Sequence, residues 1–194
     1  MDAFTAGINV LTALAAAAAA VVTFIGLNSW RRQLRTNADF EAARRALLAA
    51  LKVRDSIISF RNPMHWVQEI AASGAKDLNY ERDLYTKRWE QVTAAGEELR
   101  LVELEGEVLW GREYLDRLRP LTDCIRDLGW GIQDYLRRKE EAPGTDPKSP
   151  WLAEAEAVVK SKSKRDAPDT YEKRLLDAVT GLEEFLRPKL AAKR

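Results

Sequence analysis

The chain divides into an uncharged N-terminal stretch and a longer part in which apolar and charged positions alternate. No ionisable side chain occurs from Ala3 to Trp30. The apolar run Phe4–Leu27 forms a helix about 36 Å long, enough for a hydrocarbon core of about 30 Å. The pattern therefore predicts one N-terminal transmembrane helix over residues 4–27.

The alanine-rich composition of this run leaves other interpretations open. Alanine is only mildly apolar, and Asn9 and three threonines make the run more polar still. A cleaved signal peptide normally has a basic start and a shorter apolar core, whereas the only early charge here is Asp2. A buried core helix also fits, but few run this long without a polar face. That missing face excludes an amphipathic surface helix.

The residues that flank the run indicate its direction. Lys and Arg are absent before it, whereas Trp30, Arg31, Arg32 and Arg35 follow it. Positive residues stay on the cytoplasmic side, and Trp favours the interface. We therefore expect the N-terminus outside and the C-terminal domain in the cytoplasm. The three arginines either contact anionic lipid headgroups or act only as topology signals.

Small residues recur every four positions inside the predicted span. The face that they form consists of Thr12, Ala13, Ala16, Ala17 and Ala20. Such a face allows close approach of two helices and suggests a homo-oligomer. The alternative is that alanine is tolerated filler.

After the span, the periodicity predicts amphipathic helices. Thr36 and Asp39 resemble a capping box that starts a helix ending near Phe60, before Asn62-Pro63. A single rod continuous with the membrane helix is equally compatible. The expected apolar stripe of this helix is Phe40, Ala43, Leu47, Leu51 and Ile58.

Arg54 is the one charge in that stripe. If buried, it needs a carboxylate partner, with Glu103 and Glu107 as candidates on another helix. The alternative is that its stem lies along the bundle and its guanidinium reaches solvent.

Further helices are expected over Met64–Ala72, from Asn79 to about Leu104 with Gly106 as its end, and over Val108–Arg138. The last carries a near-heptad seam, with Pro120 as a kink or restart. The seam consists of Leu115, Leu118, Leu121, Ile125, Leu128, Ile132 and Tyr135.

The C-terminal part begins with a proline-rich loop over residues 141–150. A short helix over Trp151–Lys160, a basic loop over residues 161–165 and a last amphipathic helix, closed by Pro188, follow. The predicted fold is all-α, with a transmembrane helix (4–27), an antiparallel helical bundle (28–140), a linker with a short helix (141–168) and a C-terminal helix (169–187).

The chemistry-bearing residues are too few for a site. One histidine, His65, and one cysteine, Cys124, cannot build a zinc site, a nucleophilic triad or an intramolecular disulfide. Phosphate-binding glycine loops are absent. We predict no catalytic, cofactor-binding or metal-binding residues.

Charge adds little evidence of a ligand. The net charge of +1 argues against a nucleic-acid partner. Residues 28–63 carry eight Lys/Arg against three Asp/Glu, an excess that nearby lipid headgroups explain. The acidic residues at positions 97, 98, 103, 105 and 107 are interpreted as a solvated helix face.

The aromatic residues have two interpretations. Trp66, Trp110 and Trp130 either pack in the core or form a contact surface on the bundle. Gly129 and Gly131, which flank Trp130, indicate close packing against a neighbouring helix.

Three stretches resemble a group of uncharacterised bacterial proteins that have one N-terminal span and a cytoplasmic helical domain. They are ARRALLAALKVRDSIISFRNP (43–63), EVLWG (107–111) and GWGIQDYLRR (129–138). The resemblance covers roughly residues 5–140 and implies a single-pass protein of the bacterial inner membrane. It implies no activity and no functional residues.

These observations favour a membrane-anchored, non-enzymatic protein that binds a protein partner or itself at the cytoplasmic face, with the lipid bilayer as its other contact. The alternative is an oligomerising membrane-perturbing effector, such as a toxin or defence component, regulated by its soluble domain. An enzyme that uses only carboxylates and arginines is the third possibility.

Overall fold

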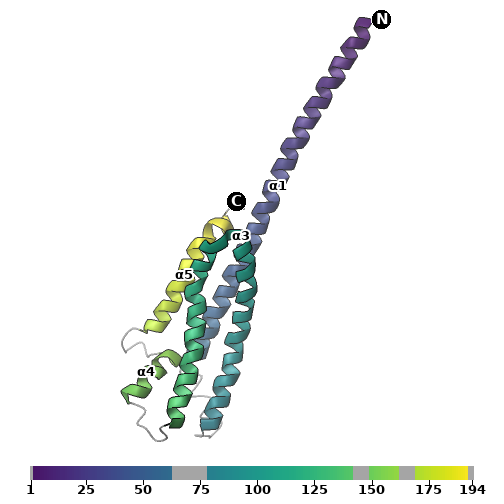
Figure 1. Ribbon diagram of the computed structural model, residues 1–194. Helices are drawn as coiled ribbons and strands as arrows, with labels where there is room; N and C mark the ends of the chain where they lie inside the picture. Colours follow the sequence, from purple (N-terminus) through teal and green to yellow (C-terminus); the bar gives the residue numbers. More distant parts are fainter. Residues whose placement is uncertain (1, 63–77, 142–148, 162–168, 192–194) are drawn as a thin grey trace.

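The structure is a computed structural model that describes residues 2–62, 78–141, 149–161 and 169–191, with side chains from Ala19 onward in the first of these segments and from Asn79 onward in the second. Its elements are α1 (Asp2–Arg61), α3 (Leu78–Glu141), α4 (Pro150–Val159) and α5 (Thr170–Ala191). The described part is all-α, as predicted, and forms a helical bundle from which one half of α1 projects (Figure 1).

Helix α1 is one continuous rod of 60 residues. The predicted helix start at Thr36 is wrong, because Thr36 lies inside the helix and its hydroxyl donates to the carbonyl of Arg32 at 3.0 Å. The continuous alternative is correct. The helix ends at Arg61, one residue before Asn62-Pro63, as the sequence indicates.

Helix α3 is a hairpin of two antiparallel arms (Figure 1). Its one non-helical residue is Gly111, at φ 64° and ψ −149°, a conformation that glycine adopts without steric cost. We call residues 78–110 the first arm and residues 112–141 the second arm. Residues at nearly equal distances in sequence before and after Gly111 lie opposite each other on the two arms. Tyr85 and Tyr135 are one such pair, with ring centroids 5.8 Å apart.

The predicted break at Gly106 and restart at Pro120 are therefore both misplaced. Gly106 is helical and buried, and a Cβ there would overlap the ring of Tyr114. Pro120 is exposed within the second arm, and the backbone remains helical around it. Gly111 makes the turn instead. Among the described residues it is the one with a positive φ, and no atom lies within 4 Å of the position that its Cβ would take.

The core face of α1 differs from the predicted stripe. Leu47 and Leu51 are only half-buried, and Ile58 is 39% exposed. Small residues occupy the core positions instead. Alanines let α1 approach the neighbouring helices closely, and the leucines then lie at the edges of the contact. The buried residues follow a heptad pattern of Ala43, Ala46, Ala50, Val53, Ile57 and Phe60.

The other two predicted stripes are confirmed more closely. In the second arm, Leu115 and Ile125 are half-buried and the remaining seam residues are buried. In α5, the helical spacing of the sequence predicts a core face, and all five of its residues are buried, namely Tyr171, Leu175, Val179, Leu182 and Leu186. The helix nevertheless passes through Pro188 and ends at Ala191. Helix α4 begins after Ser149, whose side chain accepts a hydrogen bond from the Leu152 amide.

Several predictions fall outside the described residues. They are the helix over Met64–Ala72, most of the proline-rich loop and most of the basic loop. The side chains of residues 4–18, which form most of the predicted span, also lie outside. Among the residues that the structure does describe, no helix is both long enough and apolar enough to cross a membrane.

Candidate functional site

The projecting half of α1 exposes apolar side chains on every side. Six of them are between 46% and 74% exposed, namely Val21, Val22, Phe24, Ile25, Leu27 and Trp30. At about 100° per residue, these positions point around the full circumference of the helix. A neighbour that covered only one face would therefore leave several of them in water.

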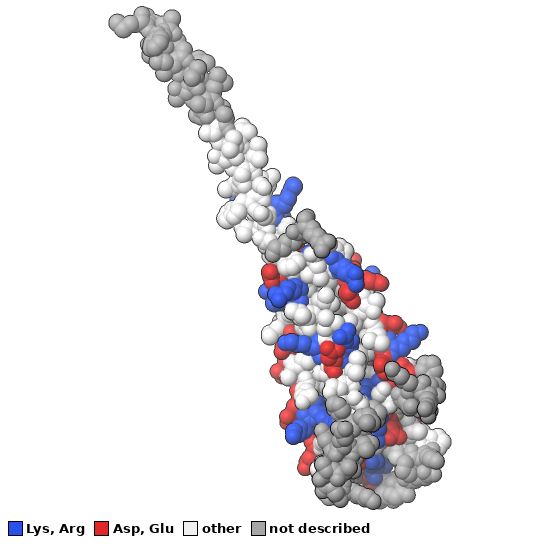
Figure 2. Space-filling view, turned by 180° about the vertical axis from the view of Figure 1, so that it is seen from behind, with Lys and Arg blue, Asp and Glu red and all other residues white. Residues whose placement is uncertain are grey.

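The predicted membrane-interface residues form a collar between this segment and the bundle. Trp30, Arg31, Arg32 and Arg35 are all exposed, and no described carboxylate forms an ion pair with the three arginines. They lie about 5–12 Å beyond Leu27 along the helix axis. In Figure 2, the first blue side chains follow an uncharged white segment of the projecting helix.

The predicted helix-packing face is described at only one of its positions. Ala20 is exposed, whereas the side chains of Thr12, Ala13, Ala16 and Ala17 lie outside the description.

Part of the basic excess in residues 28–63 contacts the acidic cluster of α3. Arg45 pairs with Glu105, and Lys52 pairs with Glu98. These side chains are at least one-third exposed, so each pair stabilises the fold by no more than about 1 kcal/mol. Their main effect is to set the register of α1 against the first arm. Contacts within the bundle therefore account for part of the basic excess.

Arg61 joins α1 to α4 and α5. Its side chain is only 2% exposed and donates to the carbonyl oxygens of Ala157 (2.9 Å), Val158 (2.9 Å) and Lys160 (3.2 Å). It also forms an ion pair with Asp169 at 3.0 Å. Three of these contacts reach the C-terminal end of α4 and the ion pair reaches the start of α5, so Arg61 fixes the corner of the bundle.

Asp169 has a second role at the same corner. Its Oδ1 accepts a hydrogen bond from the Glu172 amide at 3.0 Å and so caps the N-terminus of α5. The ring of Tyr171 lies against the guanidinium of Arg61, with its centroid 4.4 Å from Cζ. The corner is closed to ligands because its charged groups are already satisfied by protein atoms.

Arg54, the one charge in the predicted stripe of α1, is 31% exposed and pairs with the adjacent Asp55 at 2.7 Å. Among the ion pairs of the described residues, it contacts neither Glu103 nor Glu107. Its exposure agrees with the interpretation that its guanidinium reaches solvent. The buried cation of α1 is Arg61.

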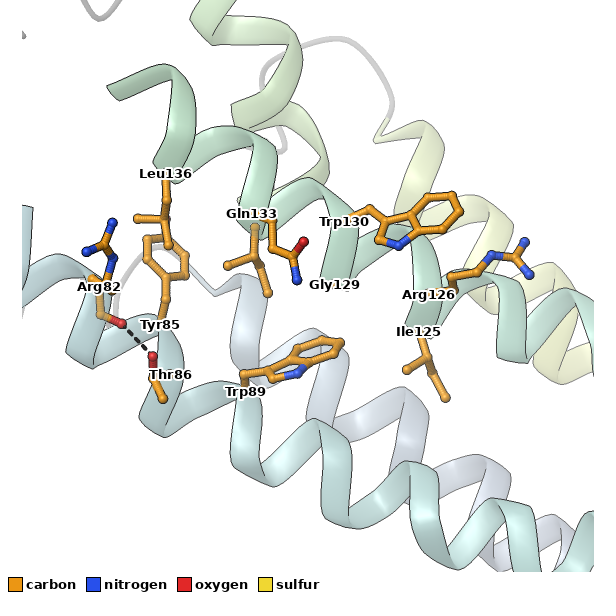
Figure 3. A pocket seen from close by; sticks show the side chains of 11 residues that line it. Arg82, Tyr85, Thr86, Trp89, Ile125, Arg126, Gly129, Trp130, Gln133 and Leu136 are labelled. Carbon is orange, nitrogen blue, oxygen red and sulfur yellow. Dashed lines mark hydrogen bonds between the residues drawn. The ribbon is translucent and has the colours of Figure 1, made fainter. Parts of the chain in front are cut away.

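A groove runs between the two arms of α3 on the outside of the bundle (Figure 3). It has a volume of about 510 Å³ and is lined by Arg82, Tyr85, Thr86, Trp89, Ile125, Arg126, Gly129, Trp130, Ile132, Gln133 and Leu136. Trp89 lies against Gly129, where a Cβ would be 3.1 Å from the indole. The absence of a side chain at Gly129 therefore keeps the floor open.

The groove continues towards the Gly111 turn. A neighbouring pocket of about 420 Å³ shares Trp89, Ile125 and Arg126 with it and extends past Gly96. Together the two form one long depression along the hairpin, with an apolar floor and with both arginines and the glutamates Glu97 and Glu103 in its lining. Its shape and chemistry suit an extended or helical segment of a protein better than a small compact molecule.

Trp130 stands at the edge of this groove and is 65% exposed. Its ring lies 5.6 Å from the guanidinium carbon of Arg126. Gly131, on its other side, packs against α4, because a Cβ there would be 2.6 Å from Val158 Cγ1. The prediction of close packing at both glycines is confirmed.

The other two tryptophans differ from Trp130. Trp110 is half-buried, packs against Tyr114 and Phe185, and donates its indole N–H to Asp39 at 3.3 Å. It is a core residue. Trp66 lies outside the described residues.

The thiol of Cys124 and four tyrosine hydroxyl groups belong to buried residues. Burial raises the pKa of the Cys124 thiol, and it also raises the pKa values of Tyr85, Tyr114, Tyr135 and Tyr171. No cluster of three or more potential metal ligands occurs among the described residues. His65 lies outside them.

No family model, curated protein or solved structure matches the chain. The projecting helix, its collar and the groove are therefore the structural features that bear on function.

Proposed function

We propose that the chain is a membrane-anchored, non-enzymatic protein of the cell inner membrane. Residues 4–27 cross the bilayer once, with the N-terminus outside, and the bundle lies in the cytoplasm, where it binds another protein or itself. The observation that carries this proposal is the exposure of apolar side chains around the whole projecting helix, from Val21 to Leu27. Only a surrounding apolar medium removes all of them from water.

The collar supports the same placement. Lipid headgroups occupy about 5–8 Å on each side of the hydrocarbon core. Trp30, Arg31 and Arg32 fall within that layer when Leu27 is at its inner boundary, and Arg35 reaches back to it through its long side chain. Because α1 continues as one helix into the bundle, the bundle is held at a fixed distance from the bilayer.

Contact with a partner protein is supported by the groove of α3. Exposed Trp and Arg are the residue types that contribute most often to binding energy in interfaces, and Trp130 and Arg126 stand together at the edge of an apolar floor. An amphipathic helix whose apolar face enters the groove fits this arrangement. Nucleic acid is disfavoured because the net charge is only +1.

The anchor is tested by alkaline extraction of membranes that contain the full chain. We expect the natural sequence to stay in the pellet. The double variant Val22→Glu/Phe24→Glu should move to the soluble fraction, because a charge costs about 2.5–3.5 kcal/mol at the centre of a span and an alanine-rich span offsets little even of the smaller cost nearer its end. Leu34→Glu, at a 48% exposed position within the collar and outside the span, should stay in the pellet. Extraction of the natural chain would contradict the anchor.

Orientation and binding need separate measurements. A reporter fused after Arg194 should be active only if it functions in the cytoplasm, and activity of a periplasmic reporter would reverse the orientation. A photo-crosslinking residue at position 130 should give a protein adduct in native membranes. The same residue in place of Trp151, which is 43% exposed on α4, should not. Equal yields at both positions would remove the groove as the binding site.

A further inference from the structure

An apolar stripe lies on the surface of the first arm, opposite its core-facing side. Leu101, Leu104 and Val108 are 71%, 58% and 86% exposed and are spaced three and four residues apart. Leu48 of α1 is 47% exposed as well. We call these four residues the outer face. Single exposed apolar residues are ordinary, but an exposed stripe marks a contact surface.

The ion pairs between α1 and the first arm bring the four residues of the outer face together. Arg45 pairs with Glu105, and Lys52 pairs with Glu98. Leu48 lies between the two cations in sequence, and Leu101 lies between the two carboxylates. The outer face therefore spans both helices at one level of the bundle.

Lipid does not reach this level. The register of the ion pairs places Val108 about level with Ala42, which is about 22 Å along α1 from Leu27. The headgroup layer is only about 5–8 Å thick. The outer face is consequently in water, and another protein surface is needed to cover it.

We propose that the outer face binds a second copy of this chain in a parallel dimer. This inference rests on the proposed function, because a shared membrane gives both copies the same orientation. A twofold axis parallel to α1 keeps every residue at its own height and places α1 of one copy opposite the first arm of the other. Leu48 of each copy then contacts Leu101 of the other.

The charges on the two helices are complementary under this rotation. Residues 41–54 of α1 carry four Lys/Arg and one acidic residue, whereas residues 97–107 of the first arm carry five Glu and one Arg. The rotation places the basic segment of each copy opposite the acidic segment of its partner. At the edges of the interface, the exposed Arg44 of one copy, which also pairs with Glu41 of its own helix at 3.7 Å, is level with the exposed Glu107 of the other.

The test uses two differently tagged full chains expressed together in their native membrane. One carries Leu48→Cys and the other carries Leu101→Cys, and a short bis-maleimide links the introduced thiols. The natural Cys124 is buried and does not react. We expect a heterodimer that carries both tags. The matched control replaces the first variant by Leu176→Cys, at a 43% exposed position of α5, and should give no heterodimer.

Charge reversal makes the test specific for this arrangement. Adding Arg44→Glu to the Leu48→Cys chain should lower the heterodimer yield about two- to fivefold, the range for an exposed ion pair. Adding Glu107→Arg to the Leu101→Cys chain should restore the yield, because the pair is re-formed with opposite sign. Failure of the second change to restore it would overturn the parallel arrangement.

The failure of this inference differs from that of the proposed function. Chains that remain in the membrane but give no heterodimer, or that give as much with Leu176→Cys as with Leu48→Cys, overturn the dimer and leave the anchor intact. A crosslink from position 101 only to a different protein also overturns it. Loss of the chains from the membrane overturns the proposed function and removes the basis for a parallel dimer.

Discussion

Replacement of Arg61 by alanine tests whether the corner between α1, α4 and α5 holds the bundle together. The change removes a guanidinium that is 2% exposed, together with the ion pair that it forms with Asp169, whose side chain is 10% exposed. It also removes the donor for the carbonyl oxygens of Ala157, Val158 and Lys160. These groups are too enclosed for water to replace the lost contacts fully.

The expected loss of stability is large. Removing one partner of a buried ion pair costs about 3–5 kcal/mol, because the charge that remains is still buried. A domain of this size is stable by about 5–15 kcal/mol, so the variant loses at least about a fifth of that stability. Asp169→Ala should show a comparable loss, since it removes the same ion pair together with the N-cap of α5.

The free energy of unfolding is measured by urea denaturation of the full chain in mild detergent, followed by helical circular dichroism. The matched control is Arg54→Ala, on the same helix, whose side chain is 31% exposed and pairs with its neighbour Asp55. That variant should lose less than about 1 kcal/mol. The double variant Arg61→Ala/Asp169→Ala should lose less than the two single losses together. An Arg61→Ala loss below about 1 kcal/mol, or one equal to that of Arg54→Ala, would refute the assignment of Arg61 as the joining residue.

Two further predictions concern packing and reactivity. Gly131→Ala should destabilise the bundle by about 1–3 kcal/mol in the same denaturation assay, because its Cβ would lie 2.6 Å from Val158 Cγ1. Gly181→Ala, with no atom within 4 Å of its Cβ, should instead stabilise α5 by up to about 1 kcal/mol, and a loss at this position would contradict the packing argument. Cys124 should resist alkylation by iodoacetamide at neutral pH in the folded chain and react at the rate of a free thiol in urea, since burial both blocks it and raises its pKa. Rapid alkylation without denaturant would show that the core opens around Cys124, whose carbonyl oxygen accepts a hydrogen bond from the Tyr171 hydroxyl at 2.6 Å.

The sequence predicted most accurately those helices whose core positions are occupied by large apolar residues. In α5 and the second arm, leucines and tyrosines at helical spacing left one plausible face, and that face is buried. In α1, leucines and alanines competed for the core. The prediction followed side-chain size, whereas the fold places alanines such as Ala46 and Ala50 in the core. Alanines let the helices approach closely, and this approach buries backbone and neighbouring side chains.

The features that decide the site depend on residues far apart in the sequence. The partners of Arg61 lie 96 to 108 positions away, so no local spacing revealed it, and its place before Asn62-Pro63 resembled an ordinary helix end. The choice between Gly106 and Gly111 as the turn depended on which pairs meet across the hairpin. The groove likewise exists only because Gly129 faces Trp89 across the two arms.

The two proposed contact surfaces lie on different sides of the first arm. The outer face joins that arm to α1, whereas Trp130 and Arg126 belong to the second arm. A parallel dimer through the outer face therefore leaves this part of both grooves accessible. Because each α1 is one helix from the proposed span to the corner at Arg61, the dimer would hold two grooves at the same height beneath the membrane. Self-association and partner binding are then compatible. A partner that carries two matching helices would bind the dimer more tightly than a single copy, because binding of its first helix holds the second helix close to the other groove.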